Sequence, residues 1–240
     1  MTWQAVAQGC APDHIDEYAR VKRVFDGDTI ELEDGRHVRL IGVNAMETGK
    51  DGKPSEPYAD EAREALSSLL EPHTRIGMRL DEEHHDQYHR LLAHLYTSGS
   101  NSIEAWLLEN GYALVIAVPP NVWNLECYRQ AEQRARMRQK GLWSESYETV
   151  TDAATLDNDA QGFHVIKGRV NQVNDTAKSV WLDLEGGVAL RIDRGDLHNF
   201  DGIKFKELLQ RQVIARGWVH RDHDRAVIRL RHSALLEVLN

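Results

Sequence analysis

The fold of this chain is decided by Val24-Phe25-Asp26-Gly27-Asp28-Thr29 and by Val38-Arg39-Leu40-Ile41-Gly42-Val43-Asn44-Ala45-Met46-Glu47. Residues 29–33 and 36–43 are rich in β-branched and apolar residues, which favours strands. Asp34-Gly35 between them is a strong signal for a two-residue turn. We therefore predict a β-hairpin that carries acidic side chains at its open end.

The turn also predicts a register for this hairpin. A two-residue turn places Glu33 opposite Arg36, and counting back along both strands places Ile30 opposite Arg39. Residues directly opposite share a face, and the face alternates along each strand. In this register Asp28 and Arg39 are diagonal neighbours on one face.

Acids beside an arginine in this arrangement predict metal-assisted phosphodiester chemistry. Asn44 and Glu47 follow the second strand and should lie beside Asp28 at the start of the first. Hard cations take oxygen ligands of this kind, and a guanidinium matches two phosphate oxygens at once. There is a plainer alternative, because acids that flank a glycine often only stabilise turns. Asp26 fits that role better than Asp28.

A second motif follows, and it reads Asp86-Gln87-Tyr88-His89-Arg90-Leu91-Leu92-Ala93. Taken together, the motifs resemble the thermonuclease (staphylococcal nuclease-like) family. The pattern of that family runs Asp-Gly-Asp-Thr, then Arg, then Asp-Thr-Pro-Glu, and later Asp-x-Tyr-Gly-Arg-x-x-Ala. The resemblance continues through Asn110-Gly111-Tyr112-Ala113 to Gly141-Leu142-Trp143-Ser144, and it covers residues 20–146.

The resemblance implies a fold and a set of site residues. The fold would be α+β and mainly β, with a five-stranded OB-fold barrel carrying three helices. Calcium would be bound by the side chains of Asp28 and Asn44 and by the carbonyl oxygen of Ala45. The resemblance implies these further roles: Glu47 as general base, Arg39 and Arg90 as the two guanidinium groups that hold the scissile phosphate, and Tyr88 as a substrate contact.

The chain departs from the family pattern at several of these positions. Asn44 stands where the family has aspartate, so one negative charge is missing and calcium affinity should be weaker. Ala45 replaces threonine, which matters less because only its carbonyl would be used. Met46 stands where proline is usual, and His89 where glycine is usual. The aromatic pair that packs on the nucleotide base is absent from residues 115–120, which leaves the base preference open.

Four closely spaced histidines offer an alternative metal site, because imidazole is a common ligand of zinc and copper. They are His84, His85, His89 and His94. The helical, glutamate-flanked spacing of metalloprotease motifs is missing around them, and we do not favour this alternative.

Length and composition are consistent with two compact domains. We expect an N-terminal tail at 1–19, the thermonuclease-like domain at 20–146, a polar linker at 147–162 and a smaller OB-like barrel at 163–240. Net charge is −9 for the whole chain, and it splits between a strongly acidic first part and a second part with 13 Lys and Arg against 10 Asp and Glu. No apolar run approaches the ~18 residues of a membrane span.

Helical periodicity and capping signals predict three helices in the first domain, at 57–71, 101–109 and 125–140. The second domain shows strand patterns at 163–173, 179–185, 188–193, 212–220 and 225–231, with a short helix at 203–210. This order resembles an OB-fold. Its Trp181 and Trp218 either fill the barrel, which we expect, or help several arginines to hold a nucleic-acid strand.

The two cysteines, Cys10 and Cys127, are compatible with one disulfide that ties the tail to the third helix, whereas cytosolic residence would leave them reduced. Ala5-Val6-Ala7 before Gln8 resembles a signal-peptide cleavage site, although no complete signal peptide is present. On these grounds we expect a periplasmic or secreted protein.

Three functions compete. The first is a calcium-dependent nuclease, a monomeric endonuclease that acts on DNA or RNA and prefers single strands. The second is a nucleic-acid-binding module that has lost cleavage, which Asn44 favours and the retained Glu47, Arg39 and Arg90 oppose. The third is a structural or protein-interaction domain, which the site residues disfavour.

Overall fold

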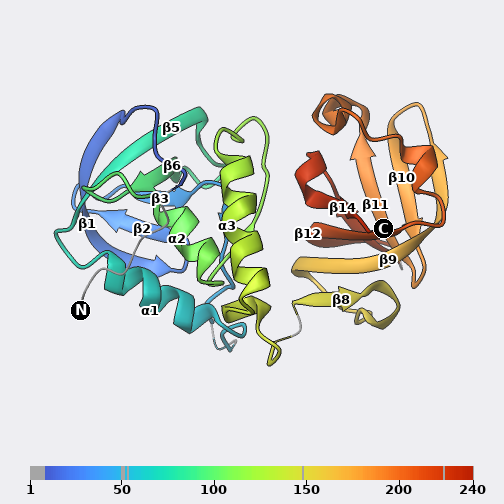
Figure 1. The fold of residues 1–240 in the computed structure, drawn as a ribbon, viewed down its shortest axis with the longest axis horizontal. Coiled ribbons are helices and arrows are strands. Elements are labelled where there is room, and N and C mark those ends of the chain that lie inside the picture. Colours follow the sequence, from blue (N-terminus) through green and yellow to red (C-terminus); the bar gives the residue numbers. More distant parts are fainter. Residues whose placement is uncertain (1–8, 50–51, 53, 148, 224, 240) are drawn as a thin grey trace. The chain divides into compact units, whose positions relative to one another are not determined.

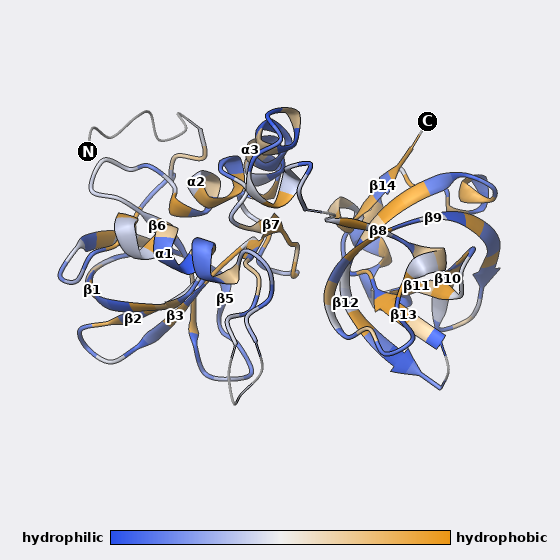
Figure 2. Ribbon diagram, turned by 90° about the horizontal axis from the view of Figure 1, so that it is seen from below, coloured by the Kyte–Doolittle hydropathy of each residue, from blue (hydrophilic) through white to orange (hydrophobic). Residues whose placement is uncertain are grey.

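A computed structural model describes the chain except for residues 1–8, 50–51, 53, 148, 224 and 240. The chain divides into two compact units. The first comprises Met1–Val115 with Pro120–Tyr147, and the second comprises Ile116–Pro119 with Glu148–Asn240. In both units hydrophobic residues alternate with hydrophilic ones along the strands (Figure 2), as expected for sheets with one face turned to a core.

The first unit is built on a closed five-stranded barrel (Figure 1) with the strand order β1-β2-β3-β6-β5. Its strands are β1 (Glu17–Asp26), β2 (Thr29–Leu32), β3 (His37–Leu40), β5 (Arg75–His85) and β6 (Leu91–Tyr96). All neighbours are antiparallel except β3 and β6, which are parallel. A closed sheet leaves no edge strand free to pair with other chains.

The described part of this unit also contains three α-helices and a small sheet. The helices are α1 (Ala59–Leu69), α2 (Ile103–Glu109) and α3 (Leu125–Met137), and the sheet pairs β4 (Val43–Asn44) with β7 (Leu114–Val115). The oxygen of Ser102 caps α2 by accepting a hydrogen bond from the Ala105 amide at 3.2 Å. Gly111 ends that segment at φ 72°, where a Cβ atom would meet the Lys140 carbonyl. The predicted helices are thus present, with shorter ends.

The hairpin of β2 and β3 forms, but in a different register. Thr29, not Ile30, lies opposite Arg39. The turn closes with the Leu32 amide bound to the Arg36 carbonyl, and Gly35 adopts φ 88°. That pattern is a three-residue loop with a left-handed glycine, which shifts the pairing by one residue relative to a two-residue turn. The predicted register was therefore wrong.

The second unit repeats the topology of the first. Its strands are β8 (Val150–Asp152), β9 (Gly162–Asp175), β10 (Ser179–Leu184), β11 (Val188–Asp193), β12 (Gln212–Asp222), β13 (Arg225–Arg229) and β14 (Leu236–Val238). Strand β12 also pairs with β9, so five strands close in the order β9-β10-β11-β13-β12. The one parallel neighbour pair in that ring is β11 with β13, the counterpart of β3 with β6. Two five-stranded OB-type barrels are therefore present.

Several details of the second unit differ from the sequence expectation. Strand β8 lies inside the expected linker 147–162 and pairs in parallel with β9, because Val150 and Thr151 continue the sheet despite the polar surroundings. The expected helix 203–210 is a single 3₁₀ turn at Phe205–Leu208. Trp181 and Trp218 do not fill the barrel, since they alternate with buried residues and 41% of Trp218 is exposed.

Cys10 and Cys127 form a disulfide, with their Cα atoms 5.5 Å apart. The bond attaches the segment before β1 to helix α3, as the sequence had suggested. Strand β1 begins at Glu17, so the ordered barrel starts within the residues assigned to the tail. Residues 1–8, including the cleavage-site-like Ala5-Val6-Ala7, lie outside the described residues.

None of the helices in the described ranges is long and apolar enough to cross a membrane.

Candidate active site

The turn between β1 and β2 positions Asp28. Gly27 in this turn packs so tightly that a Cβ atom would lie 2.5 Å from the Cβ of Ala45 and 2.7 Å from that of Ala62. No side chain fits there, which explains the glycine of the motif. The close packing holds Asp28 against the segment that follows β3, where the other predicted ligands are found.

Asp28 and Arg39 form a buried ion pair. The Arg39 Nη2 atom lies 2.8 Å from Asp28 Oδ2, and the side chains are 13% and 8% exposed. The same carboxylate oxygen accepts a hydrogen bond from the Ala45 amide at 2.8 Å. The Thr29 hydroxyl lies 3.1 Å from Asp28 Oδ1. Asp28 and Arg39 are neighbours, as predicted from the sequence. They meet because the long Arg39 side chain reaches Asp28, since the predicted strand register is not the observed one.

The guanidinium of Arg39 is held by protein acceptors on both of its terminal nitrogens. Nη1 donates to the carbonyl oxygens of Leu40 and Val43 at 2.9 and 3.0 Å. Nη2 donates to Asn44 Oδ1 at 3.2 Å as well as to Asp28. Asn44 is itself buried. Arg39 therefore sits in a fixed orientation between two of the predicted calcium ligands.

Burial raises the pKa of the Asp28 carboxyl to about 7, because a desolvated carboxylate is costly. The Arg39 guanidinium opposes this rise in pKa, whereas the neighbouring Asp26 carboxyl adds to it. Asp26, Asp28 and the Arg39 guanidinium thus share a small, largely buried space. A further cation beside Asp28 would favour its ionised form and lower this pKa.

Arg90 approaches the same group of residues from the start of β6. Its Nη1 atom lies 3.4 Å from the Thr29 hydroxyl, which in turn contacts Asp28. Its Nε atom pairs with Asp86 Oδ2 at 2.7 Å. The fold therefore brings the two predicted arginines to the same end of β2, although they are far apart in sequence.

Asp86 positions Arg90. This residue belongs to the second sequence motif, but no role was predicted for it. Its Oδ1 atom accepts hydrogen bonds from the amides of Tyr88 and Arg90, both at 2.9 Å, while Oδ2 holds the Arg90 side chain. His89 between them has φ 63°, a left-handed conformation that explains why glycine is usual at this position. Histidine is among the residues that tolerate it.

Glu47 and Tyr88 have exposed side chains, unlike the buried Asp28. The Glu47 amide donates to Glu56 Oε2 at 2.9 Å, and its carbonyl accepts from the Glu56 amide. The Tyr88 ring is 70% exposed and lies 5.5 Å from the Arg90 guanidinium. Glu47 comes two residues after Ala45, whose amide is bound to Asp28, and its side chain is exposed to solvent.

The donor atoms fit a hard cation, but only as part of a larger coordination shell. Asp28, Asn44 and the Ala45 carbonyl offer oxygen atoms of the kind that calcium takes. Among the described residues there is no group of three or more His, Cys, Asp or Glu side chains placed to hold a metal. This finding also gives no support to the alternative metal site at the closely spaced histidines.

Comparison with known proteins identifies the family. The chain is 36% identical over 126 residues to the thermonuclease of Staphylococcus intermedius, and the match covers 51% of this chain and 74% of that protein. This chain belongs to the staphylococcal nuclease family. The family model described as staphylococcal nuclease homologue matches residues 37–145. The thermonuclease of Staphylococcus hyicus is 33% identical, with 75% of it covered.

A third relative of this nuclease-family chain is the endonuclease YhcR of Bacillus subtilis, which is 33% identical over 138 residues that make up 11% of that protein. The matches cover about half of the present chain. The expected family and OB-type fold are thus confirmed, and the names of the relatives support nucleic-acid hydrolysis. The family match falls on the first barrel, which also holds Asp28, Arg39 and Arg90.

Proposed function

We propose that this chain is a calcium-dependent nuclease that cleaves the phosphodiester bonds of DNA or RNA, preferably in single strands. The main supporting observation is that Arg39 contacts Asp28 and Arg90 contacts Thr29, and that the side chains of Asp28 and Thr29 contact each other. The exposed Glu47 follows two residues after Ala45, whose amide is bound to Asp28. Two guanidinium groups at one site suit the stabilisation of a doubly charged phosphorane.

In this proposal Arg90 is the first arginine to contact the substrate, because its side chain is 29% exposed against 13% for Arg39. Arg39 donates to four protein oxygens through its two terminal nitrogens, so a phosphate oxygen would bind its Nε–H or replace one of these acceptors. Glu47 accepts the proton of the attacking water. Calcium held by Asp28, Asn44 and the Ala45 carbonyl would supply charge neutralisation and an acidified water.

The test is Glu47→Gln, which keeps the shape of the side chain and removes its basicity. Turnover on single-stranded DNA should fall by about 10²–10⁴-fold, while binding of the strand stays nearly unchanged. Glu64→Gln, at a position on helix α1, is a matched control that should cleave at the wild-type rate. Wild-type turnover by Glu47→Gln would refute the assigned base.

The alternative is a binding module without cleavage, and the neutral Asn44 amide is the observation that favours it. Incubation of the purified chain with single-stranded DNA, with calcium or with chelator, separates the two functions. Calcium-dependent cutting supports the nuclease, whereas retention of an intact strand in both conditions supports the module.

We also propose a periplasmic or secreted location and a monomeric state. The Cys10–Cys127 disulfide supports an oxidising compartment. Fractionation of the producing cells and light scattering of the purified chain test these two proposals.

A further inference from the structure

The outer face of the second barrel carries a row of aromatic and basic side chains. Trp181 on β10 pairs with Arg191 on β11, and Arg191 pairs with Arg229 on β13. The antiparallel register of β12 and β13 places Trp218 beside Arg229 at the end of their ladder. These four residues, called the aromatic-basic row below, lie side by side across four strands.

The row faces away from the barrel interior. Val180 and Leu182, on either side of Trp181, are buried, and so is Val219 next to Trp218. Since successive side chains alternate between the faces of a strand, both tryptophans point outward. Trp218 is 41% exposed and contacts Phe163 edge to face, with the ring centroids 5.1 Å apart. The two tryptophan side chains therefore lie outside the barrel core and do not contribute to its packing.

Acidic residues hold the arginines of the row in place without covering them. Asp193 pairs with Arg191 at 2.7 Å and with Arg229 at 2.8 Å, yet those guanidinium side chains stay 42% and 49% exposed. Arg191 and Arg225 lie 5.5 and 5.7 Å from the Trp181 ring. The arrangement fixes cations beside an aromatic face, which reduces the entropy lost on binding an anion.

We propose that the aromatic-basic row binds single-stranded nucleic acid. Bases would stack on Trp181 and Trp218, and backbone phosphates would pair with Arg191 and Arg229. Neighbouring strands lie about 4.8 Å apart, so three strand steps along the curved barrel wall separate the backbones of the two tryptophans by roughly 14 Å, a span that admits more than one nucleotide. A duplex keeps its bases stacked inside, whereas a single strand offers them.

The charge of the second unit supports this choice of ligand. Residues 163–240 have 13 Lys and Arg against 10 Asp and Glu, while the remainder of the chain is strongly acidic. An acidic protein repels a polyanion, so local cationic surface is needed to retain one. In the OB-fold, the face of the second and third strands is a common binding surface for oligonucleotides, and β10 and β11 occupy that position here.

The proposal goes beyond the cleavage chemistry and can be tested separately from it. Binding of a fluorescein-labelled (dT)15 strand to the full chain is measured by fluorescence anisotropy, with EDTA present and strand integrity checked on a denaturing gel. Trp181→Ala should raise the Kd by about 5- to 100-fold, because stacking on one aromatic side chain has that weight. Trp181→Phe, which keeps an aromatic face, should bind within about threefold of wild type.

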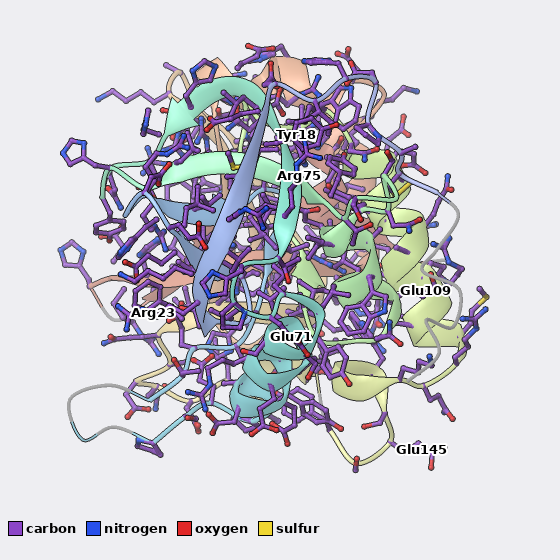
Figure 3. The ribbon with its side chains drawn as sticks, turned by 90° about the vertical axis from the view of Figure 1, so that its left-hand side faces the viewer. Tyr18, Arg23, Glu71, Arg75, Glu109 and Glu145 are labelled. Atoms are coloured by element: carbon purple, nitrogen blue, oxygen red, sulfur yellow. A yellow bond between two sulfur atoms is a disulfide. The ribbon has the colours of Figure 1, made fainter. Side chains whose placement is uncertain are left out.

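The matched aromatic control is Tyr18→Ala in the first barrel. Tyr18 is 54% exposed and lies 4.0 Å from the Arg75 guanidinium (Figure 3), so it is an outward aromatic residue with a cation on its ring. This variant should bind (dT)15 within about twofold of wild type. An equal loss of affinity in Tyr18→Ala and Trp181→Ala, or no loss in Trp181→Ala, would overturn the proposal.

A second experiment compares alanine variants of two arginines with the same exposure, one inside the aromatic-basic row and one outside it. Arg191 and Arg169 are both 42% exposed and both pair with a carboxylate, but Arg169 lies on β9 outside the row. Arg191→Ala should reduce the slope of log Kd against log salt concentration by the amount that corresponds to about one phosphate contact. Arg169→Ala should leave this slope unchanged. Equal slopes in both variants would contradict the proposal that the aromatic-basic row binds the strand. Binding of a polyglutamate peptide that depends on Trp181, without binding of (dT)15, would assign the face to an acidic protein instead.

Discussion

Replacing Glu104 by glutamine should change how the stability of the first barrel depends on pH. Glu104 is fully buried in helix α2, where its carboxylate accepts hydrogen bonds from the Leu95 amide at 2.7 Å and the Ser102 hydroxyl at 3.0 Å. Burial raises its pKa from 4.5 to about 8, and the hydrogen bonds only partly oppose the rise. The Leu95 amide belongs to β6, the strand that follows Arg90.

The direction of the effect follows from the raised pKa. The folded barrel binds the Glu104 proton more tightly than the unfolded chain, so this group contributes its full stabilisation below about pH 4.5. That contribution is lost as the pH rises through the folded-state pKa of about 8. Between pH 5 and pH 8 the loss amounts to about 3 kcal/mol for a shift of this size. Glutamine cannot ionise, so Glu104→Gln should remove the pH-dependent contribution of this residue to the free energy of unfolding. The contributions of the other carboxylates should stay the same.

The assay is hydrogen–deuterium exchange of the β6 amides in the oxidised full chain, which reports the free energy of opening this part of the barrel. Wild type and Glu104→Gln are compared at the same pH, so the intrinsic exchange rates cancel. The difference in opening free energy should shift in favour of the variant by about 3 kcal/mol between pH 5 and pH 8. A difference that stays constant over this range would show that Glu104 ionises with an unshifted pKa, and the reasoning would be refuted.

Three further predictions concern the candidate site and the disulfide. Asn44→Asp should raise calcium affinity by about tenfold in titration calorimetry, because it adds a charge beside Asp28; equal affinities would remove residue 44 from the ligand set. Asp86→Ala should lower kcat on single-stranded DNA on the order of 10²-fold, because Arg90 loses the carboxylate that orients it, and a change in KM alone would argue against positioning. Cys10→Ser should lower the free energy of unfolding by about 4–5 kcal/mol in urea titrations, since the bond spans 117 residues, and reduced wild type should then match the variant.

Much of the fold follows from the sequence because its signals are local. The Asp-Gly turn, the capping residue of α2 and the glycine that ends it each act within a few residues, and the corresponding elements form. The register of β2 and β3 was missed for an equally local reason. Asp34-Gly35 suits both a two-residue turn and the end of a three-residue loop, and only the pairing of Leu32 with Arg36 selects the second.

The features that sequence reasoning missed depend on contacts between distant segments. The role of Asp86 becomes visible only when its loop places three donors around one carboxylate. Strand β8 looks like linker because its residues are polar, and its pairing partner β9 lies further along the chain. The outward direction of Trp181 was missed for another reason, because the predicted strand 179–185 nearly matches β10 and its alternation already assigns the inward positions to Val180, Leu182 and Leu184.

The two barrels share one strand order but place their charged groups in opposite ways. In the first barrel Asp28 and Arg39 are buried, so each charge is costly and each partner is fixed, which suits a site that must act on one phosphate with defined geometry. In the second barrel Arg191 and Arg229 lie on the outer face and stay largely exposed, which suits contacts that hold a strand without selecting a single bond. Exposed arginines bind polyanions with a strong dependence on salt concentration. Salt screens the interaction between Asp28 and Arg39 far less, because these side chains are largely buried. Raising the ionic strength should therefore weaken strand binding much more than it slows turnover at saturating substrate, and comparison of KM with kcat across a salt series measures both. An equal response of kcat and KM to salt would contradict this division of roles.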